Sequence, residues 1–353
     1  MNLREMIENP LQNAKLNFRP YLIAEAGVNH EGSLDLARLL IDQAKEGGAD
    51  AIKFQTYKAS TIASKDSPSY WDLSKEPTDS QYKLFQKYDK FWKSEFEALA
   101  NYCQDVDIEF MSTPFDIESA RFLNDLMNVF KISSSDLNNK PFIDIICGYG
   151  KPIILSTGAS YLWEVEQSVS WIEAHGNPVA LLHCVLNYPT DDANANLAMI
   201  QTLKQKFPEH IIGYSDHTLP KDMKTLEVAT ILGSKIIEKH FTNDKSLPGN
   251  DHYHAMDKED LEAFNSRLDD LQALLGQSVR EPLTSELVAR KNARRSLVSS
   301  KRIEKGELID ANCITWKRPG TGIDPREISN ILGKTAAVDI TEDSIFTWSM
   351  INE

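Results

Sequence analysis

The chain has 353 residues, of which 41% are hydrophobic and 25% charged, and this composition is typical of a folded globular protein. Its formal charge is −14, from 38 basic and 52 acidic residues, so we do not expect a protein that binds the nucleic-acid backbone. The amino-terminal stretch MNLREMIENPLQNAKLNF lacks the apolar core of a signal peptide, and no apolar run reaches the roughly 20 residues that cross a membrane. We therefore expect a soluble protein.

The four cysteines are widely spaced along the chain and form no C-x-x-C pair. This spacing predicts neither a disulfide framework nor a thiolate zinc site. A protein of the reducing cytoplasm fits this pattern best.

From Tyr21 onward, short apolar runs alternate with longer amphipathic stretches, which is the pattern of βαβ units and a parallel sheet. The runs are YLIAEAG, AIKFQTY, IEFMSTP, VFKISSS, PIILSTG, VALLHCV, IIGYSDH and KIIEKHF. Their number and their span of about 250 residues predict a (β/α)8 TIM barrel, whereas an open doubly wound sheet would ordinarily need fewer strands. Between the first two runs, Ser33 is expected to cap a helix with one apolar face that ends at Gly47 and Gly48.

The predicted barrel is preceded by a short extension and followed by a linker and a small domain. We expect an N-terminal extension over residues 1–20, the barrel over 21–276, a linker over 277–293 and a small β-rich domain over 294–353. The segment 58–92 follows the second strand and is unusually long, so on a barrel it would cover the catalytic face as a lid or a substrate loop.

Polar side chains lie at the carboxyl ends of the predicted strands, where the active sites of barrel enzymes are found. In chain order they are Glu25, Lys53, Thr113, Lys131, Ser134, Ser156, His183, His217 and His240. Charged side chains within apolar runs need partners or a ligand, because an unpaired buried charge is costly. Each lysine could simply pair with a nearby acid. Together with the two serines, however, the lysines favour a clamp for a carboxylate and a phosphate.

Two of these strand ends carry imidazoles. His217 and His240 end adjacent strands and could share a divalent metal, with Glu25 brought near by barrel closure. Mn, Zn, Fe or Co would each suit such ligands. His30 either positions a phosphate or caps the following helix, and His252 and His254 are expected to be exposed on a loop.

The same residues carry a family resemblance. The motifs IAEAGVNHEGS, KFQT, STPF, KPIILSTG, LLHC, NYPT, GYSDHT, EKHFT, LPGNDH and KRPGTGI occur in an order and spacing that resemble the bacterial sialic acid synthases. The resemblance covers nearly the whole chain from Tyr21. It implies a barrel joined to a small antifreeze-like (SAF) domain that is swapped across a homodimer, so that Arg318 completes the active site of the partner.

The resemblance also implies the chemistry. The enzyme would be a metal-dependent transferase that joins phosphoenolpyruvate to an open-chain N-acetylated hexosamine, with Mn2+ as the expected metal and Mg2+ or Co2+ as alternatives. Glu25 would orient or deprotonate the attacking water, and His217 and His240 would hold the metal. The residues expected to bind phosphoenolpyruvate are Lys53, Thr113, Lys131, Ser134 and Ser156.

For the sugar, the resemblance assigns contacts to Gln55, Asp136, Tyr188 and Asp251. Asp136 occupies a position that is glutamate in some members that use N-acetylmannosamine, and Leu186 stands where those members have asparagine. These departures favour a 2,4-diacetamido-trideoxyhexose of the legionaminate or pseudaminate type as a rival substrate. Two other classes stay open. One is another barrel enzyme, either a Schiff-base aldolase acting through Lys131 or Lys53 or a related phosphoenolpyruvate-condensing enzyme, and the other is a non-enzymatic ice-binding or sugar-binding module.

Overall fold

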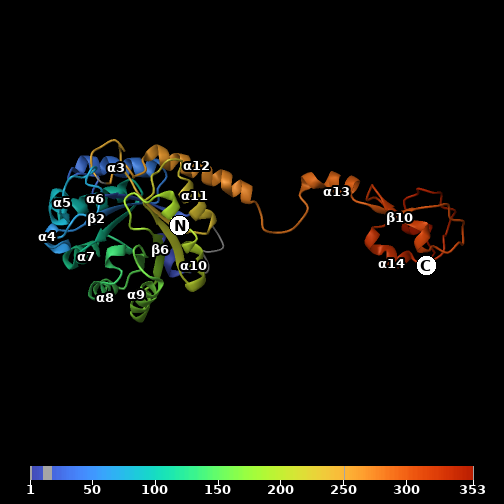
Figure 1. Cartoon of the computed structure of the whole chain (residues 1–353), viewed down its shortest axis with the longest axis horizontal. Helices are drawn as coiled ribbons and strands as arrows, with labels where there is room; N and C mark the ends of the chain where they lie inside the picture. Colours follow the sequence, from blue (N-terminus) through green and yellow to red (C-terminus); the bar gives the residue numbers. More distant parts are fainter. Residues whose placement is uncertain (1, 11–17, 250, 353) are drawn as a thin grey trace. The chain divides into compact units, whose positions relative to one another are not determined.

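The computed structural model describes residues 2–10, 18–249 and 251–352, and the chain forms two compact units, Met1–Leu275 and Gly276–Glu353. In the first unit, parallel strands form the centre and helices surround them (Figure 1). The strands are β1 (Tyr21–Gly27), β2 (Ala51–Thr56), β3 (Glu109–Pro114), β4 (Phe130–Ile132), β5 (Ile153–Ser156), β6 (Val179–Cys184), β7 (Ile211–Asp216) and β8 (Ile236–His240).

The eight strands follow the order β3-β2-β1-β8-β7-β6-β5-β4, and β3 also packs against β4. The sheet is thereby closed, which confirms the predicted barrel and excludes an open doubly wound sheet. The register places the strand ends at one level, because Glu25 pairs with Lys53 on one side and with His240 on the other. The three side chains therefore start from neighbouring positions at the same end of the barrel.

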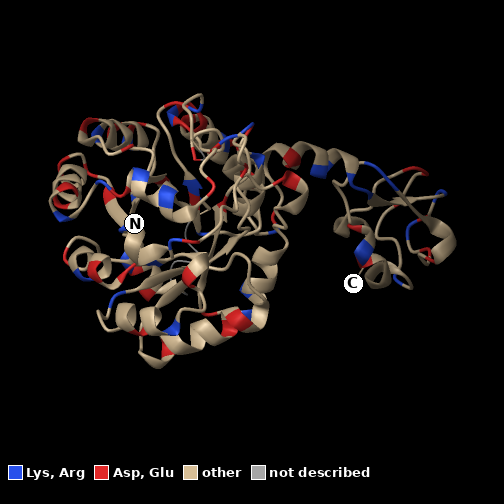
Figure 2. Ribbon diagram, turned by 60° about the vertical axis from the view of Figure 1, so that its left-hand side comes forward, with Lys and Arg blue, Asp and Glu red and all other residues tan. Residues whose placement is uncertain are grey.

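The outer helices follow the strands in the alternation that the sequence predicts. They are α3 (Leu34–Glu46), α6 (Lys93–Asp105), α7 (Ile117–Leu123), α8 (Lys140–Cys147), α9 (Leu162–Ala174), α10 (Met199–Lys206), α11 (Lys224–Ile231) and α12 (Lys258–Leu275), with a short turn η2 (Asp192–Asn194) before α10. In α3 the Ser33 hydroxyl accepts a hydrogen bond from the Leu36 amide, and Gly47 is the C-cap, as predicted. Figure 2 shows acidic and basic residues interspersed along these helices.

The segment 58–92, called the lid segment below, has structure of its own. It contains α4 (Ala59–Ile62) and α5 (Gln81–Tyr88), and an antiparallel bridge joins Pro68 to Ser80. The Trp71 indole N–H donates to the carbonyls of Glu76 and Thr78, both at 3.1 Å. The lid segment is therefore a folded element that is stabilised from within.

The amino terminus contributes to the barrel, although the sequence predicted only an extension there. The helix α1 (Leu3–Glu8) buries Leu3, Met6 and Ile7. These side chains join a core cluster with residues at the starts of the strands, among them Tyr21 and Ile236. Because the strands are parallel, this helix packs at the end of the barrel opposite the strand ends that carry the charged residues.

The second unit is small and has its own core. It contains η3 (Thr284–Glu286), α13 (Leu287–Ala293), η4 (Ala311–Cys313), η5 (Pro325–Glu327), α14 (Ile328–Ile331), η6 (Trp348–Met350) and the antiparallel strands β9 (Ser296–Ser299) and β10 (Ile314–Lys317). Leu297, Ile331 and Phe346 are fully buried at its centre.

All four cysteines of the chain are buried and free, as expected. Among the described residues, no helix has both the length and the apolar character needed to span a membrane.

Candidate active site

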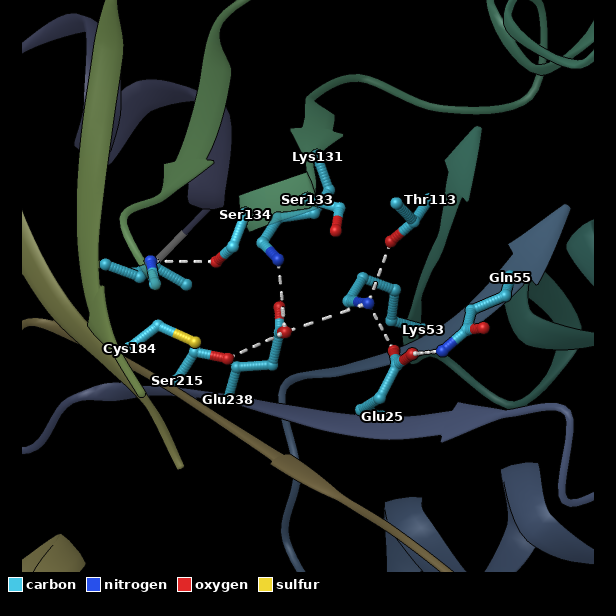
Figure 3. A network of polar contacts seen from close by, with 12 residues as sticks. Glu25, Lys53, Gln55, Thr113, Lys131, Ser133, Ser134, Cys184, Ser215 and Glu238 are labelled. Atoms are coloured by element: carbon cyan, nitrogen blue, oxygen red, sulfur yellow. Dashed lines mark hydrogen bonds and ion pairs between the residues drawn. The ribbon is translucent and has the colours of Figure 1, made fainter. Parts of the chain in front are cut away.

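Four charged side chains meet inside the barrel at the carboxyl ends of the strands (Figure 3). Glu25, Lys53, Lys131 and Glu238 are each at most 5% exposed. Lys53 is in contact with the Glu25 carboxylate, and its Nζ lies 3.8 Å from Glu238 Oε1. Lys131 Nζ lies 3.2 Å from the same Glu238 oxygen. The cluster therefore contains two cations and two carboxylates and is formally neutral when all four are charged.

Glu238 was missed by the sequence analysis, although it lies in the run KIIEKHF two residues before His240. Like Glu25, it is a charged residue inside an apolar run, so the same signal in the sequence identifies it. Ser215 also donates to its Oε1 at 3.2 Å. The structure thus bears out the simpler interpretation that each lysine pairs with an acid, and it also gathers the lysines at one site, as the clamp requires.

The two carboxylates differ in their electrostatics. Burial raises the pKa of Glu25, although Lys53 opposes the shift and Glu238 adds to it. Burial would also raise the pKa of Glu238, but Lys131 and Lys53 outweigh it and lower that pKa. Neighbouring groups whose pKa values are pushed apart can take different roles in proton transfer. Glu25 is therefore the carboxylate that takes up a proton more readily, and Glu238 stays ionised at neutral pH.

Hydroxyl groups complete this end of the site. Lys53 donates to Thr113 Oγ1 at 2.9 Å, and Ser134, in the turn η1 (Ser134–Asp136), accepts from the Gly158 amide at 2.9 Å. Ser156 Oγ is buried and has no hydrogen-bond partner among the described residues. All five residues predicted to bind phosphoenolpyruvate line one cavity of about 50 Å3, together with Glu25 and Glu238. The arrangement offers cations and hydroxyl donors to a small anion.

The predicted metal ligands lie beside this cluster. The ring centroids of His217 and His240 are 5.4 Å apart. His217 Nδ1 is 2.8 Å from the Val185 carbonyl and donates to it, which leaves Nε2 to bind a ligand. His240 Nδ1 is buried and has no hydrogen-bond partner among the described residues. Burial lowers the pKa of both rings, to about 4 for His217, so both are neutral at neutral pH, as metal ligands must be.

The predicted metal site rests on two imidazoles. In the part of the chain that the structure describes, no group of three or more His, Cys, Asp or Glu residues could hold a metal ion. A catalytic metal site usually has three protein ligands and one open position, so substrate or water would have to supply the other ligands here. The neutral rings are of the kind that bind divalent ions, and metal binding at this pair stays a prediction.

The expectation that His252 and His254 are exposed is wrong, since they are 3% and 0% exposed. The chain after β8 folds back over the strand end, where the Met256 amide donates to the His240 carbonyl at 2.8 Å. His254 consequently lies against His240, with ring centroids 4.9 Å apart, and its Nε2 is 3.6 Å from Asp251 Oδ1. A loop that returns to cover the barrel could not be recognised from local sequence.

Two other histidines have local structural roles. His30 Nδ1 accepts from the Gly32 amide at 3.0 Å, and its ring stacks on Phe91 at 4.1 Å. This bond stabilises the turn before α3, whose cap is Ser33, so His30 does not cap that helix, and phosphate binding by His30 stays untested. His183 Nε2 lies 2.8 Å from the Ala195 carbonyl and donates to it.

A larger cavity of about 460 Å3 adjoins the charged cluster. It is lined by all four residues predicted to contact the sugar, Gln55, Asp136, Tyr188 and Asp251. Gln55 donates to Glu25 at 2.9 Å, and the Tyr188 ring lies 4.3 Å from the His217 ring. Gln55, Tyr188 and His240 line both cavities, so the two spaces meet beside the histidine pair.

Arg318 belongs to the second unit, where its side chain is exposed. Its role in the active site of a partner stays a prediction.

Comparison with known proteins identifies the family. Residues 40–280 match the NeuB family, and residues 294–352 match the SAF domain. The chain belongs to the NeuB family. This confirms the resemblance drawn from the motifs, including the antifreeze-like tail.

Relatives of this NeuB family member cover almost its whole length. The chain is 38% identical over 339 residues to the N,N'-diacetyllegionaminic acid synthase of Legionella pneumophila, covering 94% of both chains. It is 37% identical to the enzyme of the same name from Campylobacter jejuni, covering 92% of this chain and 98% of the relative. A crystal structure of N-acetylneuraminic acid synthetase from Leptospira borgpetersenii has a TM-score of 0.68 at 35% identity, over 77% of this chain and 91% of that one.

Proposed function

We propose that this protein is a nonulosonic acid synthase that condenses phosphoenolpyruvate with an open-chain N-acetylated hexosamine and water. The products are a nine-carbon 2-keto sugar acid and phosphate. The observation that carries the proposal is the junction of two sites, because a buried lysine and hydroxyl cluster meets a neutral histidine pair beside a cavity large enough for a sugar. An aldehyde bound at this junction would lie between the lysine and hydroxyl cluster and the histidine pair.

Lys53 and Lys131 are the groups suited to bind the carboxylate and phosphate of phosphoenolpyruvate, with hydroxyls from Thr113, Ser134 and Ser156. An incoming anion adds negative charge to a cluster that is already neutral. Proton uptake by Glu25, whose pKa burial raises, offsets part of that charge. The pair of lysines thereby retains a net attraction for the anion.

In the reaction, carbon 3 of phosphoenolpyruvate forms a bond to the aldehyde carbon, and the aldehyde oxygen takes up a proton to become a hydroxyl. Water adds at carbon 2 and loses a proton, and the carbon–oxygen bond to phosphate breaks to leave the ketone. Glu25, whose Oε1 accepts from Gln55, is placed to orient that water or to move one of these protons.

His217 and His240 would hold a divalent metal, for which we propose Mn2+, with Mg2+ or Co2+ as alternatives. When bound, such an ion polarises the aldehyde oxygen and makes the carbonyl carbon more electrophilic. Within the chain, the bond from His217 Nδ1 to the Val185 carbonyl fixes that ring so that Nε2 is available.

For the sugar we propose a 2,4-diacetamido-trideoxyhexose rather than N-acetylmannosamine. Leu186 lines both cavities and presents an alkyl side chain where an amide would bind a hydroxyl. The relatives from Legionella and Campylobacter carry the name N,N'-diacetyllegionaminic acid synthase, which supports this choice.

We further propose a cytoplasmic, domain-swapped homodimer in which the partner's SAF domain supplies an arginine equivalent to Arg318.

The test is phosphate release from phosphoenolpyruvate with Mn2+ and a panel of N-acetylmannosamine and 2,4-diacetamido sugars. We expect turnover that EDTA abolishes and Mn2+ restores, and no turnover in His217→Ala. His175→Ala is the matched control, because that histidine lies at the end of α9 beside Asp144 and outside both cavities. No release with any sugar, or activity in His217→Ala, would overturn the proposal. Trapping of pyruvate on Lys131 or Lys53 by borohydride would instead identify an aldolase.

A further inference from the structure

The lid segment forms a wall of the larger cavity. Its side chains Ile62, Tyr70, Leu84, Phe85 and Tyr88 are among those that line that space. The sequence could assign the segment only to the catalytic face. The structure shows which of its side chains line the cavity.

The arrangement of the two cavities determines how a bound sugar is oriented. Gln55, Tyr188 and His240 line both, so the reacting aldehyde belongs at their junction. The rest of the sugar then extends into the larger cavity, away from the lysine cluster. The substituents farthest from the aldehyde therefore lie in the cavity that the lid segment helps to line.

The wall that the lid segment contributes contains both apolar and polar side chains. Its aliphatic and phenyl side chains are Ile62, Leu84 and Phe85, and Leu186 adds a further alkyl side chain from the loop after β6. Thr61 and Gln81 of the lid segment line the same cavity. A hydroxyl that faces the three apolar side chains loses its hydrogen bonds to water and gains none from them, whereas a methyl group gains contacts. Asp136 and Asn139 line the same cavity and offer polar atoms to an amide, and Asn139 Nδ2 donates to Asp136 Oδ1 at 2.9 Å.

The wall is held in place by contacts within the lid segment and to the barrel. The Phe85 ring packs against Tyr57 with centroids 5.1 Å apart. Lys87 Nζ donates to the buried Glu76 at 2.8 Å. The Tyr70 ring lies 6.4 Å from the ring of Tyr188, which itself packs on His217. A preorganised wall discriminates between substituents more sharply than a loop that must be ordered by the ligand.

We propose that Ile62, Leu84 and Phe85 of the lid segment determine the sugar specificity of this enzyme. They receive the C6 methyl of a 6-deoxy sugar and the methyl of a second acylamino group, and they disfavour hydroxyls at these positions. The inference rests on the proposed function, since it names the part of the chain that selects the sugar.

The test compares kcat/KM for a 2,4-diacetamido-2,4,6-trideoxyhexose and for N-acetylmannosamine, by phosphate release with Mn2+ and phosphoenolpyruvate. In Leu84→Asn, which keeps the branched shape of the side chain but replaces its two methyl groups with the oxygen and nitrogen of an amide, we expect the ratio of the two values to fall at least about tenfold. The KM for phosphoenolpyruvate should not change. Leu73→Asn is the matched control, because Leu73 is also in the lid segment but is 49% exposed and outside the cavity.

Ile62→Asn serves as a second variant at a half-buried position, and it decides the question where Leu84→Asn fails to fold. An unchanged ratio in the folded cavity variants overturns the inference while leaving the synthase intact. Preference of the unaltered enzyme for N-acetylmannosamine also overturns it. Absence of turnover with both sugars is a different result, because it removes the proposed function and the inference with it.

Discussion

Lys131 Nζ lies 3.2 Å from Glu238 Oε1 inside the barrel, and both side chains are buried. Lys53 approaches the same oxygen from β2 at 3.8 Å. An anion that binds these lysines therefore competes with a carboxylate that is ionised at neutral pH. The ion pair between Lys131 and Glu238 stabilises the free enzyme, and it also weakens the attraction of the lysines for phosphoenolpyruvate.

Glu238→Gln should separate these two effects. Removal of one partner of a buried ion pair costs about 3–5 kcal/mol, so we expect a lower Tm for the free variant. Phosphoenolpyruvate should then raise the Tm by more than it does in the unaltered enzyme, because its charges replace the missing carboxylate. Thermal unfolding with and without phosphoenolpyruvate measures both.

The control is Glu109→Gln, at the start of β3, where Tyr21 donates to the Glu109 carboxylate at 2.6 Å. This site lies at the other end of the barrel, so the ligand-induced shift should match that of the unaltered enzyme. Equal shifts in Glu238→Gln and Glu109→Gln would contradict the competition.

Arg318→Ala should lower kcat/KM on the order of 100-fold, which is the usual effect of removing one charged group that stabilises a transition state. The exposed side chain adds little to folding, so the Tm of the barrel should stay within about 1 °C by the small cost of surface changes. Arg326→Ala controls for loss of charge in the same unit, since Arg326 pairs with its neighbour Asp324 at 3.0 Å. Full activity of Arg318→Ala in steady-state kinetics would refute the role.

The sequence predicted the barrel because each strand is a short apolar run whose carboxyl end faces one side. The same rule predicted that Lys53 and Lys131 lie at one end, and the structure places them there. It did not predict their partners. Which acid a buried lysine meets depends on the register between β2, β4 and β8, and that register is set by packing around the whole barrel.

The loops were predicted less well than the strands. His254 was expected to be exposed because a loop usually is, but the backbone bonds of Met256 with His240 and Thr242 bring it into the barrel mouth. The lid segment could be recognised as unusually long, but not as a folded wall. Bonds such as that from the Trp71 indole to the Thr78 carbonyl join residues without any periodic pattern.

The helix α1 gives a prediction about stability alone. Leu3 is fully buried among residues at the starts of the strands, and Leu3→Ala should lower the free energy of unfolding by about 2–5 kcal/mol. The site lies at the opposite strand ends, so kcat well below the Tm should not change. Leu39→Ala, at a position 43% exposed, should have little effect on either quantity. A Leu3→Ala variant with unaltered urea unfolding would show that α1 does not close the barrel.

The buried imidazole of His30 should make the free energy of unfolding depend on pH. Burial, and to a lesser degree Lys90, lowers its pKa from 6.5 to about 3. The unfolded chain binds this proton below pH 6.5 and the folded chain does not, so the stabilisation from a neutral His30 is present above pH 6.5. It is lost as the pH falls from 6.5 towards 3. Between pH 7.5 and 5.0 the loss from this one group is about 2 kcal/mol, by proton linkage.

His30→Asn removes the titrating ring, so its free energy of unfolding should fall about 2 kcal/mol less over that pH interval than that of the unaltered protein. Urea unfolding at pH 7.5 and 5.0 gives the comparison. Phe91→Leu is the control, because it removes the ring that stacks on His30 at 4.1 Å but keeps the imidazole. It should lower stability at both pH values by similar amounts. If His30→Asn has the same pH dependence as the unaltered protein, the buried imidazole does not supply this stabilisation, and the acid sensitivity comes from other groups.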